Sequence, residues 1–283
     1  MGLLSNKIDR EVLKPGDHIY SWRNAYLYAH HGCPFDFSLV FDILRAGLIV
    51  CECKVPYMKL GIYAGDETVI HFTRGGGQEI GTGTVLDRFV FSSSPAHPSD
   101  NPCPKCGDQS RLDGVISSCI DCFLSGGDLY LFEYDVSAAL FLAKPRGGTC
   151  TLAKSDPPED VLHRASFLLQ NGFGGYNIFK NNCEDFAIYC KTGLLVITNI
   201  SVGRSGQAAS FLAATSAVVS SPLRFLTSSF SGLAVVGYGM YCASRLVSDI
   251  GVRRDVSKIP VERLIASSSR NESEVVAALA KEN

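Results

Sequence analysis

The stretch Asn-Asn-Cys-Glu-Asp-Phe-Ala-Ile-Tyr-Cys, residues 181–190, constrains this chain more than any other. Apolar residues at helical spacing follow Cys183, and a basic residue, Lys191, precedes Gly193, so the pattern predicts a short helix that begins at Cys183. Unpaired N–H groups and the positive dipole end at a helix start favour a thiolate, the nucleophilic form of cysteine. The alternative is a buried structural cysteine.

Two histidines far upstream favour the nucleophile. His30 belongs to a His-His-Gly triplet that ends an aromatic segment. His71 lies in the second strand of a predicted hairpin, residues 61–72, whose turn is Gly-Asp-Glu at 65–67. A cysteine with two histidines from distant parts of the chain is typical of thiol enzymes, in which one histidine is the base and a second group orients it.

These segments resemble the lecithin retinol acyltransferase (LRAT) family. The family includes the H-Ras-like suppressor phospholipases/acyltransferases and is a permuted relative of the NlpC-type cysteine peptidases. The resemblance runs from about Leu13 to Leu195, and its motifs are Pro-Gly-Asp-His-Ile at 15–19, His-His-Gly at 30–32, Ile-Tyr at 62–63, Ile-His-Phe at 70–72 and Asn-Cys-Glu-Asp-Phe at 182–186.

The resemblance implies a role for each site residue. Cys183 would be the nucleophile and His71 the orienting partner. His30 would be the base, because the family's histidine stands two residues before the Gly or Ala. One departure is Asp185, which replaces a second histidine of the family's Asn-Cys-Glu-His-Phe motif.

The second departure is an apolar block, Cys33 to Gly61, which splits the family's His-x-Gly-Ile-Tyr motif. Removing the block makes the motif contiguous. We therefore hypothesise a retained intron or an erroneous exon boundary; a block found in every transcript would instead be a genuine insertion that separates His30 from its strand.

Two Cys-x-x-Cys pairs predict a zinc site. Cys103 and Cys106 form one pair, Cys119 and Cys122 form the other, and twelve residues separate the two pairs. Each pair puts two thiolates on a tight turn, and together they complete a tetrahedral, structural zinc site with no open position. Disulfides or a redox pair are the alternatives. We expect a loop-rich insertion, residues 95–127, that is held by metal because it lacks a core of its own.

Composition indicates a cytoplasmic protein that does not bind nucleic acid. Charge is nearly balanced, at −2, and no secretory signal precedes the early charges at residues 7–11. The 11 cysteines therefore suggest a reducing compartment rather than a disulfide framework. Gly2 suggests N-myristoylation, although Asn6 occupies the position where that signal usually has Ser or Thr.

The expected organisation is an N-terminal arm (1–12), an LRAT-like catalytic domain (13–197) and an apolar helical tail (198–283). The tail has no charge from Phe225 to Ser244, so it either associates with a membrane or packs on the catalytic domain. Within the domain we expect strands at 84–91 and 129–136, and a helix over 157–169 that is capped by Asp156. Its His163 should face solvent, because Arg164 is next to it.

The predicted fold class is α+β: a small antiparallel sheet packed by helices, permuted papain-like or NlpC-like, with a zinc-knuckle insertion. The predicted function is a Cys–His thiol acyltransferase or phospholipase-type hydrolase that acts on lipid esters, without an organic cofactor, at a membrane surface. The lipid substrate is implied by the resemblance alone. The alternatives are a non-catalytic membrane-associated adaptor and a peptidase or deamidase of the same fold.

Overall fold

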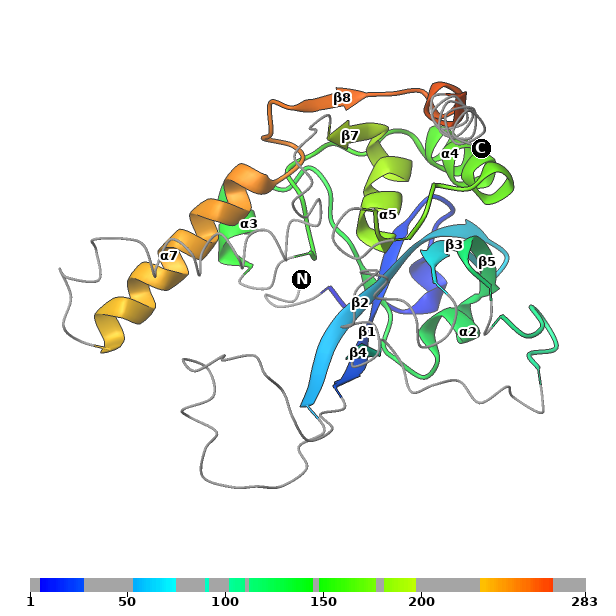
Figure 1. The fold of residues 1–283 in the computed structure, drawn as a ribbon, viewed down its shortest axis with the longest axis horizontal. Coiled ribbons are helices and arrows are strands. Elements are labelled where there is room, and N and C mark those ends of the chain that lie inside the picture. The colour runs from blue at the N-terminus through cyan, green and yellow to red at the C-terminus, as the bar shows by residue number, and fades with distance from the viewer. Residues whose placement is uncertain are drawn as a thin grey trace, which may run out of the picture.

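An antiparallel sheet organises the chain (Figure 1). The structure is a computed structural model that describes residues 6–27, 53–74, 90–91, 102–109, 112–144, 148–176, 181–196 and 230–266. Five strands lie in the order β4-β1-β2-β3-β5, and β6 also pairs with β1. Their bounds are β1 His18–Leu27, β2 Cys53–Gly65, β3 Thr68–Thr73, β4 Val90–Phe91, β5 Gly114–Cys119 and β6 Tyr130–Leu131.

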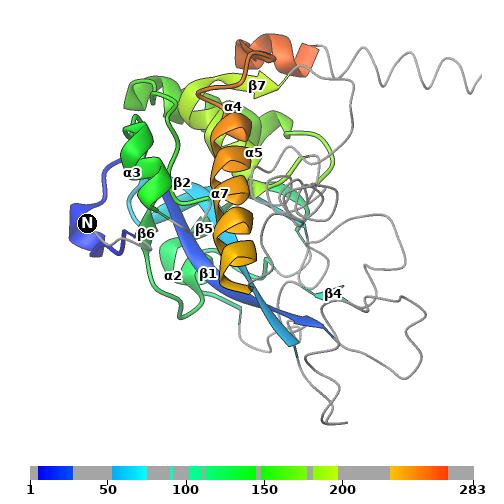
Figure 2. The ribbon, with the colours of Figure 1, turned by 90° about the vertical axis from the view of Figure 1, so that its left-hand side faces the viewer.

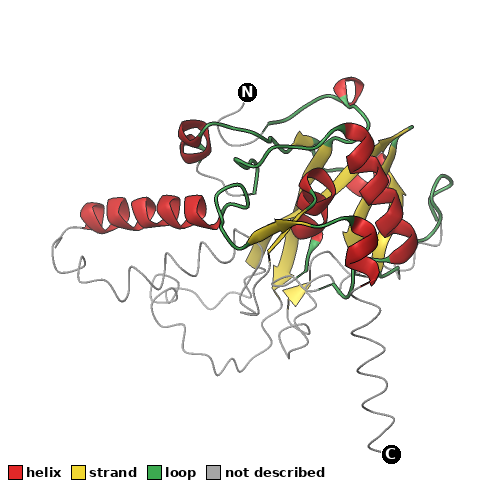
Figure 3. Cartoon of the chain, turned by 90° about the horizontal axis from the view of Figure 1, so that it is seen from above, coloured by secondary structure: helices red, strands yellow, loops and turns green. Residues whose placement is uncertain are grey.

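Helices pack on both faces of this sheet and at its end (Figures 1 and 3). The described helical elements are η1 Arg10–Val12, α2 Ile120–Leu124, α3 Ala138–Ala143, α4 Pro158–Asn171, α5 Cys183–Thr192 and α7 Phe230–Ser248. A second sheet consists of β7 Leu194–Val196 and β8 Val256–Lys258. The predicted α+β class is confirmed.

The predicted hairpin joins β2 to β3, and its turn residues Asp66 and Glu67 have positive φ angles of 46° and 55°. β2 extends well upstream of this hairpin, because Cys53–Gly61 pairs with β1 in one continuous register that runs from His18↔Ile62 to Leu27↔Cys53. The end of the apolar block is therefore a strand of the main sheet. The rest of the block, residues 33–52, lies outside the described residues.

One face of the sheet packs on α4 and α5. Alternate residues of a strand point to the same face, and those that point to this face share a buried cluster with both helices. The sheet contributes Tyr20, Met58, Leu60, Ile62, Ile70 and Phe72, and the helices contribute Val161, Ala165, Leu168, Cys183, Phe186, Ala187, Tyr189 and Cys190.

The other face packs on α2, which follows β5 within the predicted insertion. Ile120, Phe123 and Leu124 are buried there together with Ile19 and Val69. The segment is less loop-rich than expected, because β5 is a strand of the main sheet and α2 covers the second face of that sheet. β5 resembles a loop in the sequence, because Gly114–Cys119 is short and contains few apolar residues.

The predicted helix over 157–169 is confirmed as α4, but its cap and one of its contacts differ from the expectation. Pro157 is the N-cap, without a side-chain cap bond. Asp156 instead accepts from Arg164 Nη2 at 2.8 Å and from Lys258 Nζ at 2.6 Å. His163 is exposed as expected, whereas its neighbour Arg164 is buried and also donates to the Cys190 carbonyl.

Two other predicted strands are found in part among the described residues. Over 84–91 the described part is β4 alone, and residues 84–89 lie outside the described residues. Over 129–136 the strand is β6, followed by a single bridge from Glu133 to Cys150. The prediction for 129–136 therefore overestimated the length of regular pairing, and the prediction for 84–91 is confirmed only over Val90–Phe91.

In the C-terminal part, α7 projects from the body and then the chain returns to it (Figures 1 and 2). Arg245 holds the base of α7, because its Nη1 donates to the Lys144 carbonyl at 2.6 Å and its guanidinium lies 4.6 Å from the Phe141 ring centre. Asp249 then accepts from Thr151 and from the Leu152 N–H. Among the helices that the structure describes, none has the length and apolar character to cross a membrane.

Candidate active site

Cys183 is the first residue of α5, as predicted. The preceding residue, Asn182, is the N-cap, and its Oδ1 accepts from the N–H groups of Glu184 at 2.8 Å and Asp185 at 3.0 Å. Asp185 returns a bond by accepting from the Asn182 N–H at 3.2 Å, which completes a capping box. At the other end Gly193 is left-handed, with φ 68°. The helix start that carries the thiol is therefore fixed by its own side chains.

The thiol of Cys183 is buried between α5 and β2. Its Sγ lies 3.5 Å from the carbonyl oxygen of Met58 and 4.0 Å from the hydroxyl of Tyr176. Three residues later in the helix, Phe186 anchors α5 by packing against Phe72 of β3. Cys183 thus contacts β2, the strand that contains the last residues of the apolar block.

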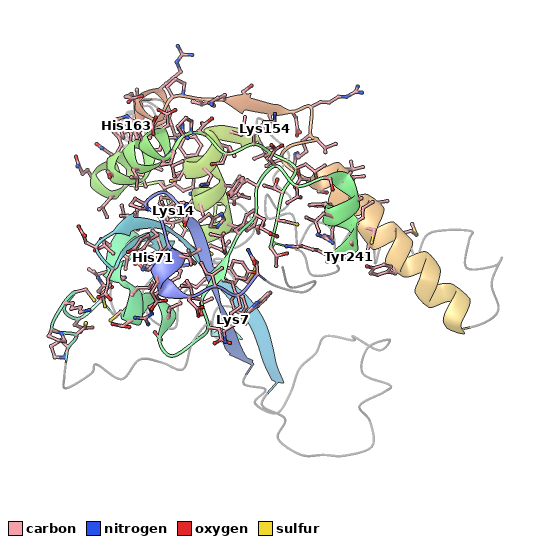
Figure 4. All side chains as sticks on the ribbon, turned by 180° about the vertical axis from the view of Figure 1, so that it is seen from behind. Lys7, Lys14, His71, Lys154, His163 and Tyr241 are labelled. Carbon is pink, nitrogen blue, oxygen red and sulfur yellow. The ribbon has the colours of Figure 1, made fainter. Side chains whose placement is uncertain are left out.

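His71 lies in β3 (Figure 4) and is buried. It contacts the segment that carries the two cysteine pairs, residues 102–124, called the knuckle segment below. Its Nε2 lies 2.7 Å from Ser118 Oγ, and Ser118 Oγ in turn donates to Gln109 Oε1 at 2.5 Å. Its ring centre is 5.4 Å from that of Phe123 in α2. The contacts that orient this imidazole therefore come from β5 and α2.

The contacts of Cys183 and His71 place the two side chains on different faces of the β2–β3 pair. Ile70 and Phe72 share the buried cluster of Cys183, and His71 alternates with them along the strand. The family-like arrangement, with His30 and His71 beside the thiol, therefore differs from the arrangement of the described residues. His30 itself lies outside the described residues.

Lys59 stands in β2 at the position two residues before Gly61. Its Nζ lies 5.3 Å from the centre of the Phe123 ring, the same ring that contacts His71. In the sequence motif His30 stands two residues before Gly32. A lysine therefore occupies the strand position that the motif would give to a histidine.

Two other thiols are buried and poorly suited to nucleophilic chemistry. Burial raises the pKa of Cys190 well above its usual range, and burial also raises the pKa of Cys150. A thiol with a raised pKa carries little thiolate at neutral pH. Both cysteines serve as internal references for the reactivity of Cys183.

The four cysteines of the two Cys-x-x-Cys pairs come together. The Sγ atoms of Cys103, Cys106, Cys119 and Cys122 all lie within 4.8 Å of one another. Two of the separations, Cys103–Cys119 and Cys106–Cys119, are 3.7 and 3.8 Å. Tetrahedral zinc with Zn–S bonds of about 2.3 Å requires sulfurs about 3.8 Å apart. The residues present therefore fit a tetrathiolate metal site.

Backbone N–H groups donate to one thiol of each Cys-x-x-Cys pair. Donation from Cys106 and Lys105 lowers the pKa of Cys103 to about 6, and the Cys122 N–H donates to Cys119 Sγ at 3.5 Å. Lys105 also pairs with Glu67 at 2.5 Å, which ties the first knuckle to the β2–β3 turn. The N–H bonds to Cys103 favour its thiolate, the form of cysteine that binds metal, whereas burial raises the pKa of Cys106 and of Cys122.

A small cavity lies beside the first turn of α5. Its volume is about 70 Å³, and its lining includes Asn181, Glu184, Asp185, Asp249 and Arg253. Cys183 does not line it. Polar and apolar groups line the cavity in similar measure, and the cavity is separate from the candidate nucleophile.

Sequence reasoning missed several residues around the predicted site. Ser118 and Gln109 hold His71 but lie in a segment without a motif, and Tyr176 and Met58 touch the thiol only through the tertiary fold. Their positions in the sequence could have indicated them. Ser118 directly precedes Cys119 of the second Cys-x-x-Cys pair, and Gln109 lies three residues after Cys106 of the first pair. Residues next to a metal knuckle have fixed positions and are therefore suited to orient others.

Comparison with known proteins assigns a family to these motifs. The sequence profile described as "Lecithin retinol acyltransferase" matches residues 42–196, a range that begins inside the apolar block and ends with β7. The chain is also 54% identical over 265 residues to "Protein LEAD-SENSITIVE 1" of Arabidopsis thaliana, covering 93% of this chain and 90% of that protein. No solved structure matches the chain. The chain belongs to the lecithin retinol acyltransferase family, which is typically composed of thiol enzymes with an NlpC/P60-like fold.

Proposed function

We propose that this protein is a thiol acyltransferase or phospholipase-type hydrolase that acts on lipid esters through Cys183. The observation that supports the proposal best is the capped start of α5, which carries the cysteine as its first helical residue. Cysteine in this position has the electrostatic environment of a nucleophile. Family membership supplies the lipid substrate class.

In the proposed reaction the Cys183 sulfur attacks the ester carbonyl, and an acyl-thioester forms as the alcohol leaves. In the roles that the family resemblance implies, His30 takes the thiol proton and returns it to the leaving oxygen, while His71 orients the base. These roles require both imidazoles to reach the Cys183 face of the β2–β3 pair. Water or an amine then accepts the acyl group. Asn182 already engages the N–H groups of Glu184 and Asp185, so the N–H of Cys183 itself is the nearest donor for the oxyanion.

The proposal is tested by mass spectrometry of the acyl-enzyme. The chain, with and without residues 33–61, is incubated with phosphatidylcholine vesicles and a primary amine, and its peptides are analysed for an acyl adduct. We expect the adduct on Cys183 and not on Cys190, whose pKa is raised by burial. The Cys183→Ser variant is the control. The absence of a Cys183 adduct in both folded forms would refute the proposal.

A non-catalytic adaptor is the second candidate. The residues of β2 favour this function for the full chain, which contains the apolar block 33–61. Lys59 and Leu60 occupy the strand beside the thiol, and neither side chain is a proton acceptor at neutral pH. An adaptor would show Cys183 reacting with an electrophilic thiol probe no faster than Cys242. The same measurement supports an enzyme if Cys183 reacts selectively.

We infer that the four-cysteine site holds one structural Zn²⁺ and that the protein works in the cytoplasm at a membrane surface. Four thiolates saturate a tetrahedral ion, so the metal orders the segment rather than binding substrate. Elemental analysis should find about one zinc per chain. Sedimentation with vesicles tests the membrane association, and protein that remains entirely in the supernatant would refute it.

A further inference from the structure

The apolar block begins after one glycine and ends on another. Gly32 directly precedes Cys33, and Gly61 directly precedes Ile62. A glycine therefore stands before Ile62 whether the block is present or removed. This coincidence matters because of the space around Gly61 in β2.

The strand position before Ile62 favours glycine. A Cβ built on Gly61 would lie 2.8 Å from Val69 Cγ1, 3.0 Å from His71 Cβ and 3.0 Å from the Ile70 carbonyl oxygen. Two of these three neighbours are backbone-fixed atoms of the paired strand, which cannot yield cheaply. Of the residues upstream of the block, Gly32 is the one that would occupy this position after removal.

The register of β1 and β2 shows what else would change. With the block, Ile19, Tyr20 and Ser21 face Gly61, Leu60 and Lys59. Without it, the same register places Gly32, His31 and His30 opposite them. In this shortened chain the last pair of the hairpin would be Asn24 with Leu27. Ala25 and Tyr26 would form the turn between them, and two residues is the commonest length of a hairpin loop. The shortened chain can thus rebuild the hairpin with β1 residues 18–23 unmoved.

The exchanged positions lie beside the candidate site. Lys59 faces the Phe123 ring that also contacts His71, and Leu60 belongs to the buried cluster of Cys183. The thiol itself lies 3.5 Å from the carbonyl of Met58, the residue before Lys59. Exchange of the segment therefore removes two imidazoles from the immediate surroundings of Cys183 and His71.

We propose that residues 33–61 act as an exchangeable segment whose last residues take the strand positions that residues 27–32 occupy in the shortened chain, and that it silences the thiol chemistry by replacing His30 and His31 with Lys59 and Leu60. This inference rests on the proposed function of Cys183. It states that two forms of the chain share one fold and differ in the presence of a proton acceptor.

The test restores the two imidazoles without removing the block. Four proteins are compared: the full chain, the full chain with Lys59→His and Leu60→His, the full chain with Lys59→Gln and Leu60→Gln, and the chain lacking residues 33–61. Each receives 4-nitrophenyl hexanoate. The sulfur of Cys183 forms the S–acyl bond, the ester C–O bond breaks, nitrophenolate leaves, and the thiol proton passes to the imidazole. Nitrophenolate release and the Cys183 adduct are measured.

We expect the shortened chain and the His/His variant to acylate Cys183 at least about 10-fold faster than the full chain, a gain within the typical contribution of a positioned base. The Gln/Gln variant should remain at the level of the full chain. Circular dichroism confirms folding, and a shortened chain that does not fold would overturn the inference, because the hairpin should rebuild.

Other outcomes separate the inference from the proposed function. If the shortened chain reacts and the folded His/His variant does not, the exchange is wrong and the function stands. If the full chain acylates Cys183 as fast as the shortened chain, the exchange is likewise wrong and the proposed function stands. Equal rates for the Gln/Gln and His/His variants also overturn the exchange. If no form acylates Cys183, both proposals fail.

Discussion

Asp185 shows how a single residue can depart from a family motif and still serve its site. Where the family has a second histidine, this chain has a carboxylate that accepts from the Asn182 N–H and closes the capping box. An acidic side chain in the first turn also complements the helix dipole. The departure therefore stabilises the helix start that carries Cys183.

Asn182→Ala should separate the capping role from general stability. Loss of its two accepted bonds should cost about 1 kcal/mol of folding free energy and should speed iodoacetamide alkylation of Cys183, because the buried thiol becomes accessible more often when the helix start loses order. Ser137→Ala is the matched control, since Ser137 caps α3 by accepting from the Leu140 N–H. Peptide mass spectrometry gives the rates. Equal alkylation in both variants would contradict the role of the cap.

His18 should make the fold sensitive to acid. Burial lowers the pKa of His18 well below its usual value of 6.5, and the positive charge of Lys191 adds to the effect. The unfolded chain therefore binds a proton that the folded chain excludes, so this contribution to stability is present above about pH 6.5 and is lost as the pH falls below it.

His18→Phe should remove this loss and retain the stacking on Phe132, whose ring centre lies 4.4 Å away. Below about pH 6.5 the unfolding free energy of the parent should fall by up to about 1.4 kcal/mol per pH unit more steeply than that of the variant. Urea unfolding at several pH values measures it. His163→Gln is the control, because the His163–Glu262 pair is exposed. Parallel pH profiles for parent and His18→Phe would refute the assignment.

At the scale of elements, the β2–β3 pair depends on close backbone contact at Gly61. Gly61→Ala should destabilise the protein by about 1–3 kcal/mol, because its Cβ would meet Val69 and the backbone of β3. Gly175→Ala should change stability by less than about 0.5 kcal/mol, since a Cβ there meets no atom within 4 Å. Urea denaturation of both variants decides the matter, and similar values would contradict the close approach.

The knuckle segment connects metal binding to the sheet, because Cys119 ends β5 and precedes α2. Cys106→Ser should lower zinc content and reduce stability by about 2 kcal/mol or more, which corresponds to roughly 5 °C in melting temperature. Cys242→Ser should change neither, since Cys242 lies outside the cluster. Elemental analysis and thermal unfolding measure both quantities. A chelator should lower the melting temperature of the parent and leave that of Cys106→Ser unchanged.

Elements with a local signal could be predicted from the sequence, and elements that depend on distant pairing could not. The helix at Cys183 and the turn at Asp66 follow from caps and turn residues. β5 and β8 were missed, because Gly114–Cys119 and Val256–Lys258 are short and become strands only beside β3 and β7. Likewise, Ser118 and Gln109 meet His71 only through the tertiary fold, which no local pattern encodes.

At the scale of the whole molecule, one buried cation determines how α7 is attached. Arg245→Ala should release the base of α7, because the bond to the Lys144 carbonyl and the contact with Phe141 are lost. Chymotrypsin should then cut faster at Tyr238 and Tyr241, two aromatic residues of this helix. The matched control is Arg254→Ala, since Arg254 is exposed. Unchanged cleavage in Arg245→Ala would show that other contacts hold the helix.

The small β7–β8 sheet has a topological consequence. β7 directly follows α5, and β8 follows α7, so one antiparallel pair joins the two ends of the excursion that contains residues 197–255. After β8, Ile259 donates to the Gly193 carbonyl and Val261 enters the main core. The excursion is thus a closed loop with a clasp at its base rather than a free end. Insertions within this loop lengthen it and leave the β7–β8 pair in place, so the length of the loop can vary without disturbing the packing of α5 on the main sheet.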